Sequence, residues 1–140
     1  MTITPALERP SAAILLDTHT FLWLVSAPDE VSPAAREVIS DPARTVCVSA
    51  VTAWEVAIKT RIGRLDGEPL LSAWPDIVAA MGLNELAIEA ADAIVAGRLS
   101  WGHRDPFDRM IVAQGARRGM TIATRDPHIL GAALTPTLMV

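Results

Sequence analysis

The sequence has 140 residues, of which 51% are hydrophobic and 20% charged. This length suits one domain with a buried core, and the composition excludes a disordered chain. The apolar run 12–16 ends at Asp17, far short of the about 20 residues that a membrane-spanning helix needs. Residues 1–11 have neither the basic start nor the apolar core of a signal peptide, and they contain two prolines. We therefore expect a flexible tail over 1–11 and one domain over 12–140.

The net charge of −4 argues at first against a nucleic-acid partner, but the charges are unevenly distributed. Residues 98–125 contain six arginines and only two acids. This asymmetry would allow a basic face, although solvated helix faces are the simpler explanation. The single cysteine, Cys47, lies between two valines, so we expect it to be buried and inert, as in a protein of the reducing cytoplasm.

The elements predicted in chain order alternate between strands and helices. They are a strand over 12–16, a helix over 21–25, a helix over 33–40, a strand over 45–48, helices over 50–62 and 70–81, a strand over 85–88, helices over 89–99 and 106–118, a strand over 120–124, one helical turn at 127–130 and a strand over 137–140. Such alternation indicates an α/β fold with a central parallel sheet and right-handed crossovers.

Two aspartates follow predicted strands at their carboxyl ends. Asp17 comes directly after the first strand, and Asp126 comes just beyond the strand over 120–124. Ligands of open α/β sheets bind outside the carboxyl ends of the strands, where the strand order reverses. The two carboxylates could therefore face each other, although an aspartate before Pro127 is also a common way to open a turn.

Glu55 lies inside the predicted helix 50–62, four residues before Lys59. An exposed ion pair at this spacing would explain it without any function. Because the helix is apolar on most sides, the carboxylate could instead point inward. There it would need a partner or a metal, since an unpaired buried charge is very costly.

The segment Asp105-Pro106-Phe107-Asp108 has the pattern of a helix start, with Asp105 as the N-cap and Pro106 in the first helical position. Acids are favoured there by the helix dipole, which would explain both aspartates. The alternative is that Asp108 faces Asp17, in which case the helix terminus would keep its carboxylate ionised and ready for a cation.

Four carboxylates in one pocket would repel each other unless divalent cations neutralised them, and oxygen ligands select Mg²⁺ or Mn²⁺. Such a site can activate water and stabilise a phosphodiester in displacement. Other chemistries have no comparable pattern. His19, His103 and His128 stand apart without zinc-ligand spacing, and neither a phosphate-binding glycine loop nor a G-x-S-x-G motif occurs.

Four segments together resemble the PIN-domain family, in the version found in VapC-type toxins of type II toxin–antitoxin pairs. They are Leu15-Leu16-Asp17-Thr18-His19, Ser49 with Trp54-Glu55, His103 to Arg109 with Ala113-Gln114, and Thr124-Arg125-Asp126. The resemblance covers residues 13–140. It implies a three-layer α/β fold with helices flanking the sheet, an Mg²⁺-dependent endoribonuclease that cleaves RNA, a small antitoxin partner and a homodimer.

By position, the resemblance implies a metal site built on Asp17 and Asp108. Glu55 would bind a second metal or orient the water, and Asp126 would act directly or through water. Asp105 would either cap its helix or support the site from outside.

The remaining residues allow more than one interpretation. Thr18 and Thr124 could hydrogen-bond the metal ligands or simply cap local structure. Arg104, Arg109 and Lys59 could contact phosphates, or pair with the antitoxin or with nearby acids. Trp23 and Trp54 are expected to be core or dimer contacts, with base stacking as the less favoured alternative. Trp101 and His103, which precede the acidic helix, are better placed to meet RNA.

Two other functions fit parts of the pattern. The runner-up is an RNA- or protein-binding module on the same fold with a degenerate site, which the presence of all four acids argues against. The third candidate function is a small Mg²⁺-dependent phosphatase. The absence of an Asp-x-Asp strand motif argues against this function. The sequence leaves open which RNA is cut and whether one metal or two are bound.

Overall fold

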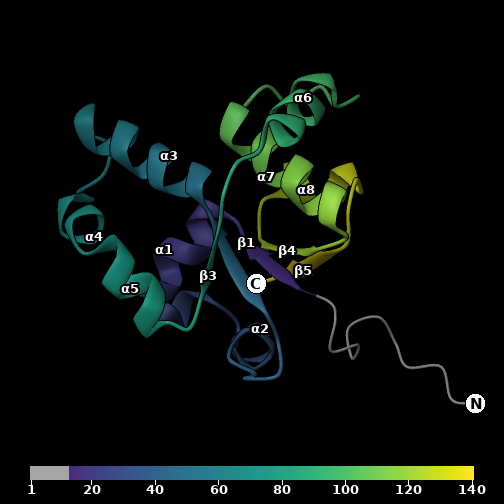
Figure 1. Cartoon of the computed structure of the whole chain (residues 1–140). Coiled ribbons are helices and arrows are strands. Elements are labelled where there is room, and N and C mark those ends of the chain that lie inside the picture. The colour runs from purple at the N-terminus through teal and green to yellow at the C-terminus, as the bar shows by residue number, and fades with distance from the viewer. Residues whose placement is uncertain (1–12) are drawn as a thin grey trace, which may run out of the picture.

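The computed structural model describes residues 13–140, which form a five-stranded sheet with helices on both faces (Figure 1). The strands are β1 (Ile14–Leu16), β2 (Val46–Ser49), β3 (Asn84–Leu86), β4 (Thr121–Thr124) and β5 (Thr137–Met139). Every neighbouring pair is parallel, and the strand order is β3-β2-β1-β4-β5. The predicted parallel α/β sheet is confirmed. The tail predicted over 1–11 lies outside the described residues.

The helices begin and end mostly where capping residues predict. They are α1 (Thr18–Ser26), the 3₁₀ turn η2 (Pro28–Glu30), α2 (Pro33–Ile39), α3 (Ala50–Arg61), α4 (Glu68–Ser72), α5 (Trp74–Ala80), α6 (Ala90–Arg98), α7 (Pro106–Arg118) and α8 (Pro127–Ala132). The side chains of Asp17, Ser32, Ser49, Asp105 and Asp126 each accept a backbone amide at a helix start.

Two hydrophobic clusters fill the space between the sheet and its helical layers. Ile14 and Leu16 of β1 point to one face, where α1, α2, α4 and α5 pack. Leu15 points to the other face, toward α7 and α8. Cys47 of β2 lies in this second cluster, where burial raises the pKa of its thiol. The expectation of a buried cysteine is confirmed.

The prediction of a single helix over 70–81 is wrong, because the chain forms two helices, α4 and α5, with a break at Ala73. Pro75 explains the break: proline has no amide to continue the helical ladder, and its ring clashes with the preceding turn. Trp74 is buried at the start of α5, and its indole donates to Glu85 at 2.7 Å.

The strand order places β1 at the centre of the sheet, with β2 on one side and β4 on the other. The order therefore reverses between β1 and β4, and ligands of this fold class bind at such a point. The Asp17 amide donates to the Ala123 carbonyl at 3.1 Å, so the chain leaving β1 stays close to β4. Among the described helices, none is both long and apolar enough to span a membrane.

Candidate functional site

Asp17 directly follows β1 and is the N-cap of α1. One carboxylate oxygen accepts the Thr20 amide at 2.8 Å, and the other accepts the Thr124 hydroxyl at 2.5 Å. The cap explains why an acid is tolerated here at only 5% exposure. The hydroxyl comes from the end of β4, so the side chain is fixed at the point where the strand order reverses.

Glu55 lies on α3 and is 4% exposed. The Thr18 hydroxyl donates to Oε1 at 2.7 Å, and Lys59 forms an ion pair with Oε2. The two interpretations drawn from the sequence therefore both hold in part: the carboxylate is buried, and it is also paired with the lysine four residues on. Both of its oxygens are engaged, which meets the requirement that a buried charge be compensated.

Asp105 and Asp108 have different surroundings although they share one helix turn. Asp105 caps α7 and accepts the amides of Phe107 and Asp108 at 2.9 and 3.1 Å. Asp108 is hydrogen-bonded through Oδ2 to His103 Nε2 at 2.7 Å. Burial raises the pKa of Asp108 to about 6; the His103 hydrogen bond opposes this shift, and the charges of Asp105 and Asp126 add to it.

Asp126 is the N-cap of α8 and accepts the His128 amide at 2.8 Å. Its own amide donates to the Thr124 hydroxyl oxygen at 3.0 Å. Asp17 and Asp126 line one hollow of about 410 Å³, together with residues that include Trp23. The two aspartates predicted at strand ends therefore border the same space.

Two threonines connect three of the predicted carboxylates. Thr124 contacts the Asp17 side chain and the Asp126 amide through the same hydroxyl. Thr18, the residue after Asp17, holds Glu55. The hydrogen bonds expected of both threonines are present, and they fix the orientation of the acids.

The fourth carboxylate, Asp108, is connected to Asp126 through His103. Ligand atoms of His103, Asp105 and Asp108 lie within 4.8 Å of one another, and so do those of His103, Asp126 and His128. Close carboxylates whose mutual repulsion raises a pKa are compensated when a divalent cation binds between them. These two groups therefore fit a divalent metal, and among the described residues neither group includes Asp17 or Glu55.

The histidines correct one conclusion drawn from the sequence. Their spacing along the chain gives no metal motif, yet the rings of His103 and His128 stack at 4.5 Å with an interplanar angle of 19°. His128 lies on α8, which follows β4, and His103 lies in the segment that leads into α7. Figure 1 shows α8 beside α7. Residues this far apart in the sequence carry no local signal of their contact.

The basic residues predicted to contact phosphates have three different environments. Arg109 donates to four backbone carbonyls at 2.7–3.0 Å, one in α6 and three in the segment between α6 and α7. One of these carbonyls belongs to His103, so Arg109 holds the approach to the acidic site in place and is poorly available to RNA. Lys59 pairs with Glu55. Arg104 is exposed.

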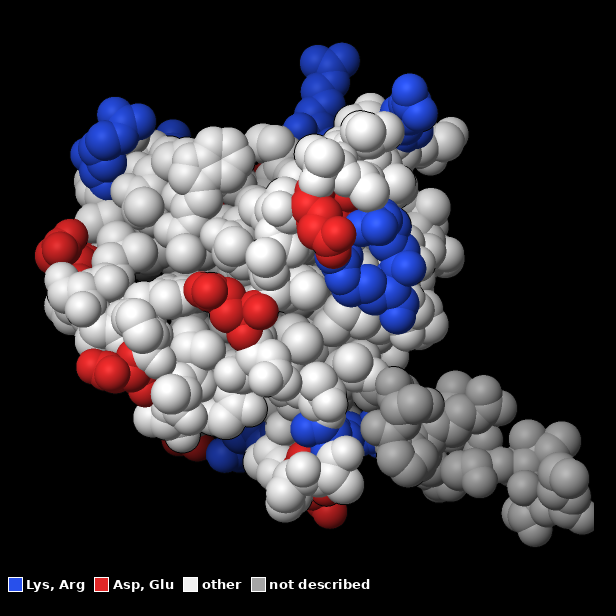
Figure 2. All heavy atoms as spheres, in the orientation of Figure 1, with Lys and Arg blue, Asp and Glu red and all other residues white. Residues whose placement is uncertain are grey.

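Most other arginines of the basic stretch also bind within the protein. Arg117 and Arg118 pair with Asp92, which is completely buried. Arg125 donates to the Val140 carbonyl and lies over the Trp23 ring, 4.4 Å from its centroid. Figure 2 shows charges of both signs scattered over one face, without a continuous basic area. The basic face considered from the sequence is not found on that side.

The tryptophans near the site differ in burial. Trp54, on α3, is 57% exposed, so its assignment to the core is wrong, while the dimer contact stays a prediction. Its ring packs edge-on against Phe107 at 5.3 Å. Trp101 is half-buried, and its ring packs against the His103 ring with 4.9 Å between the ring centroids.

Comparison with solved structures identifies similar folds at low identity. A chain of the DNA-bound VapBC structure from Salmonella typhimurium has a TM-score of 0.68 and 18% identity, covering 91% of this chain and 97% of its own. A chain of FitAB bound to the IR36 DNA fragment has a TM-score of 0.63 and 24% identity, and the match covers 89% of this chain and 93% of the FitAB chain. VapBC-5 from Mycobacterium tuberculosis has a TM-score of 0.56 and 21% identity, covering 92% and 99%.

No curated protein sequence matches the chain significantly. In contrast, the sequence model of the PIN-domain family matches residues 14–133. That match spans β1 to α8 and includes every acid of the site described above. The chain therefore belongs to the PIN-domain family.

Proposed function

We propose that this protein is an Mg²⁺-dependent endoribonuclease that acts as the toxin of a type II toxin–antitoxin pair in the cytoplasm. The observation that carries the proposal is the pair of aspartates, Asp17 and Asp126, on either side of the point where the strand order reverses. Asp108, with its raised pKa, adds a carboxylate whose ionisation a divalent cation would favour. PIN domains are generally nucleases, and the family membership supports the same activity.

In this proposal Asp17, Asp108 and Glu55 hold the metal, and Asp126 acts directly or through a water. The bound ion, Mg²⁺ or Mn²⁺, would supply charge neutralisation and a more acidic water. Thr124 keeps Asp17 oriented, and Glu55 or Asp126 would orient the attacking water.

Lys59 and Arg104 are the basic side chains proposed to meet RNA phosphates. Lys59 neutralises Glu55 until substrate or metal binds, because its ammonium group already lies against that carboxylate. Asp105 keeps the start of α7 in place by capping it.

The test is a cleavage assay with purified protein on structured and single-stranded RNA, with single-stranded DNA as the comparison. We expect cleavage with Mg²⁺ or Mn²⁺, none with EDTA, and a loss of several orders of magnitude in Asp17→Asn and Asp108→Asn. The matched control is Asp76→Asn, an exposed aspartate in the first turn of α5. RNA binding that ignores metal, with no cleavage, would support the degenerate binding module instead.

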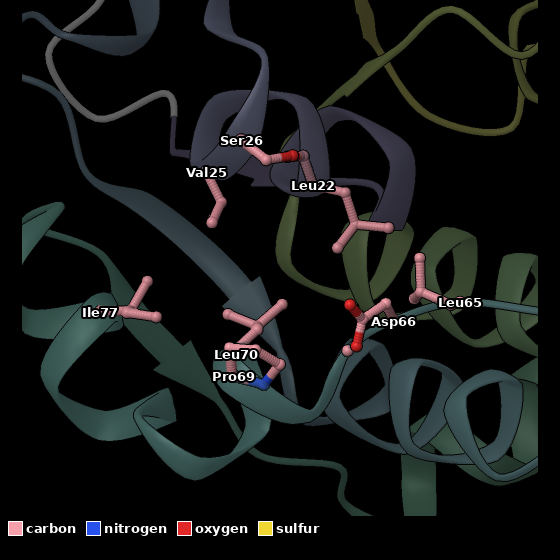
Figure 3. A pocket seen from close by; sticks show the side chains of 9 residues that line it. Leu22, Val25, Ser26, Leu65, Asp66, Pro69, Leu70 and Ile77 are labelled. Atoms are coloured by element: carbon pink, nitrogen blue, oxygen red, sulfur yellow. The ribbon is translucent and has the colours of Figure 1, made fainter.

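We assign the antitoxin to an apolar groove between α1 and the 65–77 region, with a volume of about 300 Å³ (Figure 3). Leu22 and Val25 of α1 face Leu70 and Ile77 across it, with Asp66 at one side. An amphipathic helix fits such a groove through its apolar face. The structural neighbours are toxin–antitoxin complexes by their names, which supports a partner of this class.

Co-expression tests this partner. The reading frame next to the gene should encode a small protein that suppresses growth inhibition by the toxin. Val25→Arg should weaken the complex while cleavage of RNA persists, because none of the four proposed site carboxylates lines the groove. Unchanged complex formation would place the antitoxin elsewhere.

We further propose a homodimer that buries Trp54. This exposed indole borders a shallow hollow formed by α3, α6 and the start of α7. Tryptophan is enriched at protein–protein interfaces, because it combines a large apolar ring with one polar group. Light scattering should give the mass of a dimer for the wild type and of a monomer for Trp54→Glu; a dimeric variant would exclude this face.

A further inference from the structure

We propose that His103, His128 and Asp126 form a binding site for a borderline transition-metal ion of the Zn²⁺ type, and that occupation of this site inhibits the nuclease. Metal binding stands on the geometry of these three side chains. Only the inhibition rests on the proposed function, since Asp126 belongs to the acidic site.

The ligand atoms of the three side chains already lie within 4.8 Å of one another. In tetrahedral Zn²⁺ sites with bonds near 2.0–2.2 Å, the ligand atoms lie about 3.4 Å apart. Metal binding requires the His128 ring to turn out of its stack on His103, because ring nitrogens bind an ion in the plane of the ring and these two planes are nearly parallel. The His128 side chain is 64% exposed, which leaves it room to turn.

The two other ligands are held in place. The backbone carbonyl of His103 accepts a hydrogen bond from the Arg109 guanidinium. The His103 ring packs against the Trp101 ring, with 4.9 Å between the ring centroids. Asp126 is fixed as the cap of α8, and its Oδ1 lies 3.1 Å from Nδ1 of His128. Two of the three ligands are therefore oriented before a metal arrives, which lowers the entropic cost of binding.

The ligand types separate this site from the carboxylate site. Imidazole nitrogen is a good ligand for Zn²⁺, Ni²⁺, Cu²⁺ and Fe²⁺, whereas Mg²⁺ prefers carboxylate oxygen and water. The stacked histidines therefore favour a transition metal even in excess Mg²⁺. Both sites use groups around Asp126 and His103, and His103 also hydrogen-bonds Asp108. An ion on the histidines consequently removes groups that the nuclease site uses.

The experiment uses the full chain without a histidine tag, because a tag would bind the same ions. The protein is treated with EDTA, dialysed, and titrated with Zn²⁺ in excess Mg²⁺ by calorimetry. We expect one Zn²⁺ per chain for the wild type and affinity about tenfold or more weaker for His128→Ala. The matched control is His19→Ala, a histidine that lines the same hollow as Asp126 but is outside the cluster.

Nuclear magnetic resonance gives a second readout, because the sequence contains only three histidines. Zn²⁺ should shift the ring signals of His103 and His128 and leave that of His19 in place. No binding by the wild type, equal binding by His128→Ala, or a shift confined to His19 would each overturn the site.

The inhibition is tested by cleavage with Mg²⁺ in the presence and absence of Zn²⁺. The ratio of the two rates should fall strongly for the wild type and much less for His128→Ala. Equal ratios in the two proteins would refute inhibition through this site. If the chain cleaves no RNA under any condition, the proposed function fails, whereas metal binding is decided by the titration and the resonance shifts. Asp17→Asn should lose cleavage and keep its Zn²⁺ affinity.

Discussion

Replacing Asp108 with asparagine should stabilise the metal-free protein at neutral pH. The pKa of this carboxyl rises from its ordinary value of 3.8 to about 6 in the folded state, chiefly because the group is buried, and further because Asp105 and Asp126 repel its charge. The folded state therefore holds the Asp108 proton more tightly than the unfolded chain does. The stabilisation that this proton provides is complete below pH 3.8 and is lost as the pH rises through about 6.

The magnitude follows from the pKa. A tenfold change in proton affinity corresponds to about 1.4 kcal/mol, so a rise from 3.8 to about 6 costs the ionised folded state about 3 kcal/mol above pH 7. Asparagine has nearly the same shape and carries no charge. Because it makes a weaker bond to His103 than a carboxylate does, we expect a net gain of about 2 kcal/mol.

The assay is urea unfolding in EDTA at pH 8 and at pH 4. Asp108→Asn should have a higher free energy of unfolding than the wild type at pH 8, and the difference should shrink toward zero at pH 4. Asp76→Asn, exposed in the first turn of α5, should show no such gain. Adding Mg²⁺ should reverse the order at pH 8, because only the wild type keeps its full set of ligands. An asparagine variant that is no more stable than the wild type in EDTA at pH 8 would refute the reasoning.

Three further predictions concern residues that support the fold and the site. Asp92→Ala should lower the free energy of unfolding by about 1.5–3 kcal/mol in urea titrations, because it removes the buried acceptor of two α7 arginines and of the Glu89 amide; a loss below about 1 kcal/mol would contradict this. Thr124→Val removes the hydroxyl that orients Asp17, so we expect metal affinity by calorimetry to fall about 10- to 100-fold with the fold intact by circular dichroism. Arg109→Ala should make the segment before α7 the first site of limited proteolysis, since three of its carbonyls lose their donor; an unchanged cleavage pattern would count against that role.

The parts of the fold that depend on local chemistry were predictable from the sequence. Asp17, Ser49 and Asp105 accept backbone amides only a few residues away, so the sequence around each helix start contains the whole interaction. The same holds for Gly119, whose positive φ ends α7. Pro75 shows the limit, because a periodic apolar pattern continued through a residue that interrupts the helix.

The environment of the site residues was harder to predict, because it depends on contacts between distant segments. The Arg109 side chain could equally have faced solvent, and only the path of the segment before α7 shows that it binds carbonyls there. The stacking of His103 on His128 likewise follows from how α8 packs, which spacing does not contain. For Glu55, burial and an ion pair with Lys59 were treated as alternatives in the sequence. Both occur, because Lys59 reaches a carboxylate that is itself buried.

The central position of β1 has a consequence for the order of events during synthesis. β1 is made first, yet its neighbour β4 and the hydroxyl that orients Asp17 come 107 residues later along the chain. Domains fold as they leave the ribosome, but contacts of long sequence separation must wait for the later segment. A growing chain therefore has no complete acidic site until β4 and α8 have emerged, so the ribosome that makes this protein is not exposed to an active nuclease while most of the chain is being translated.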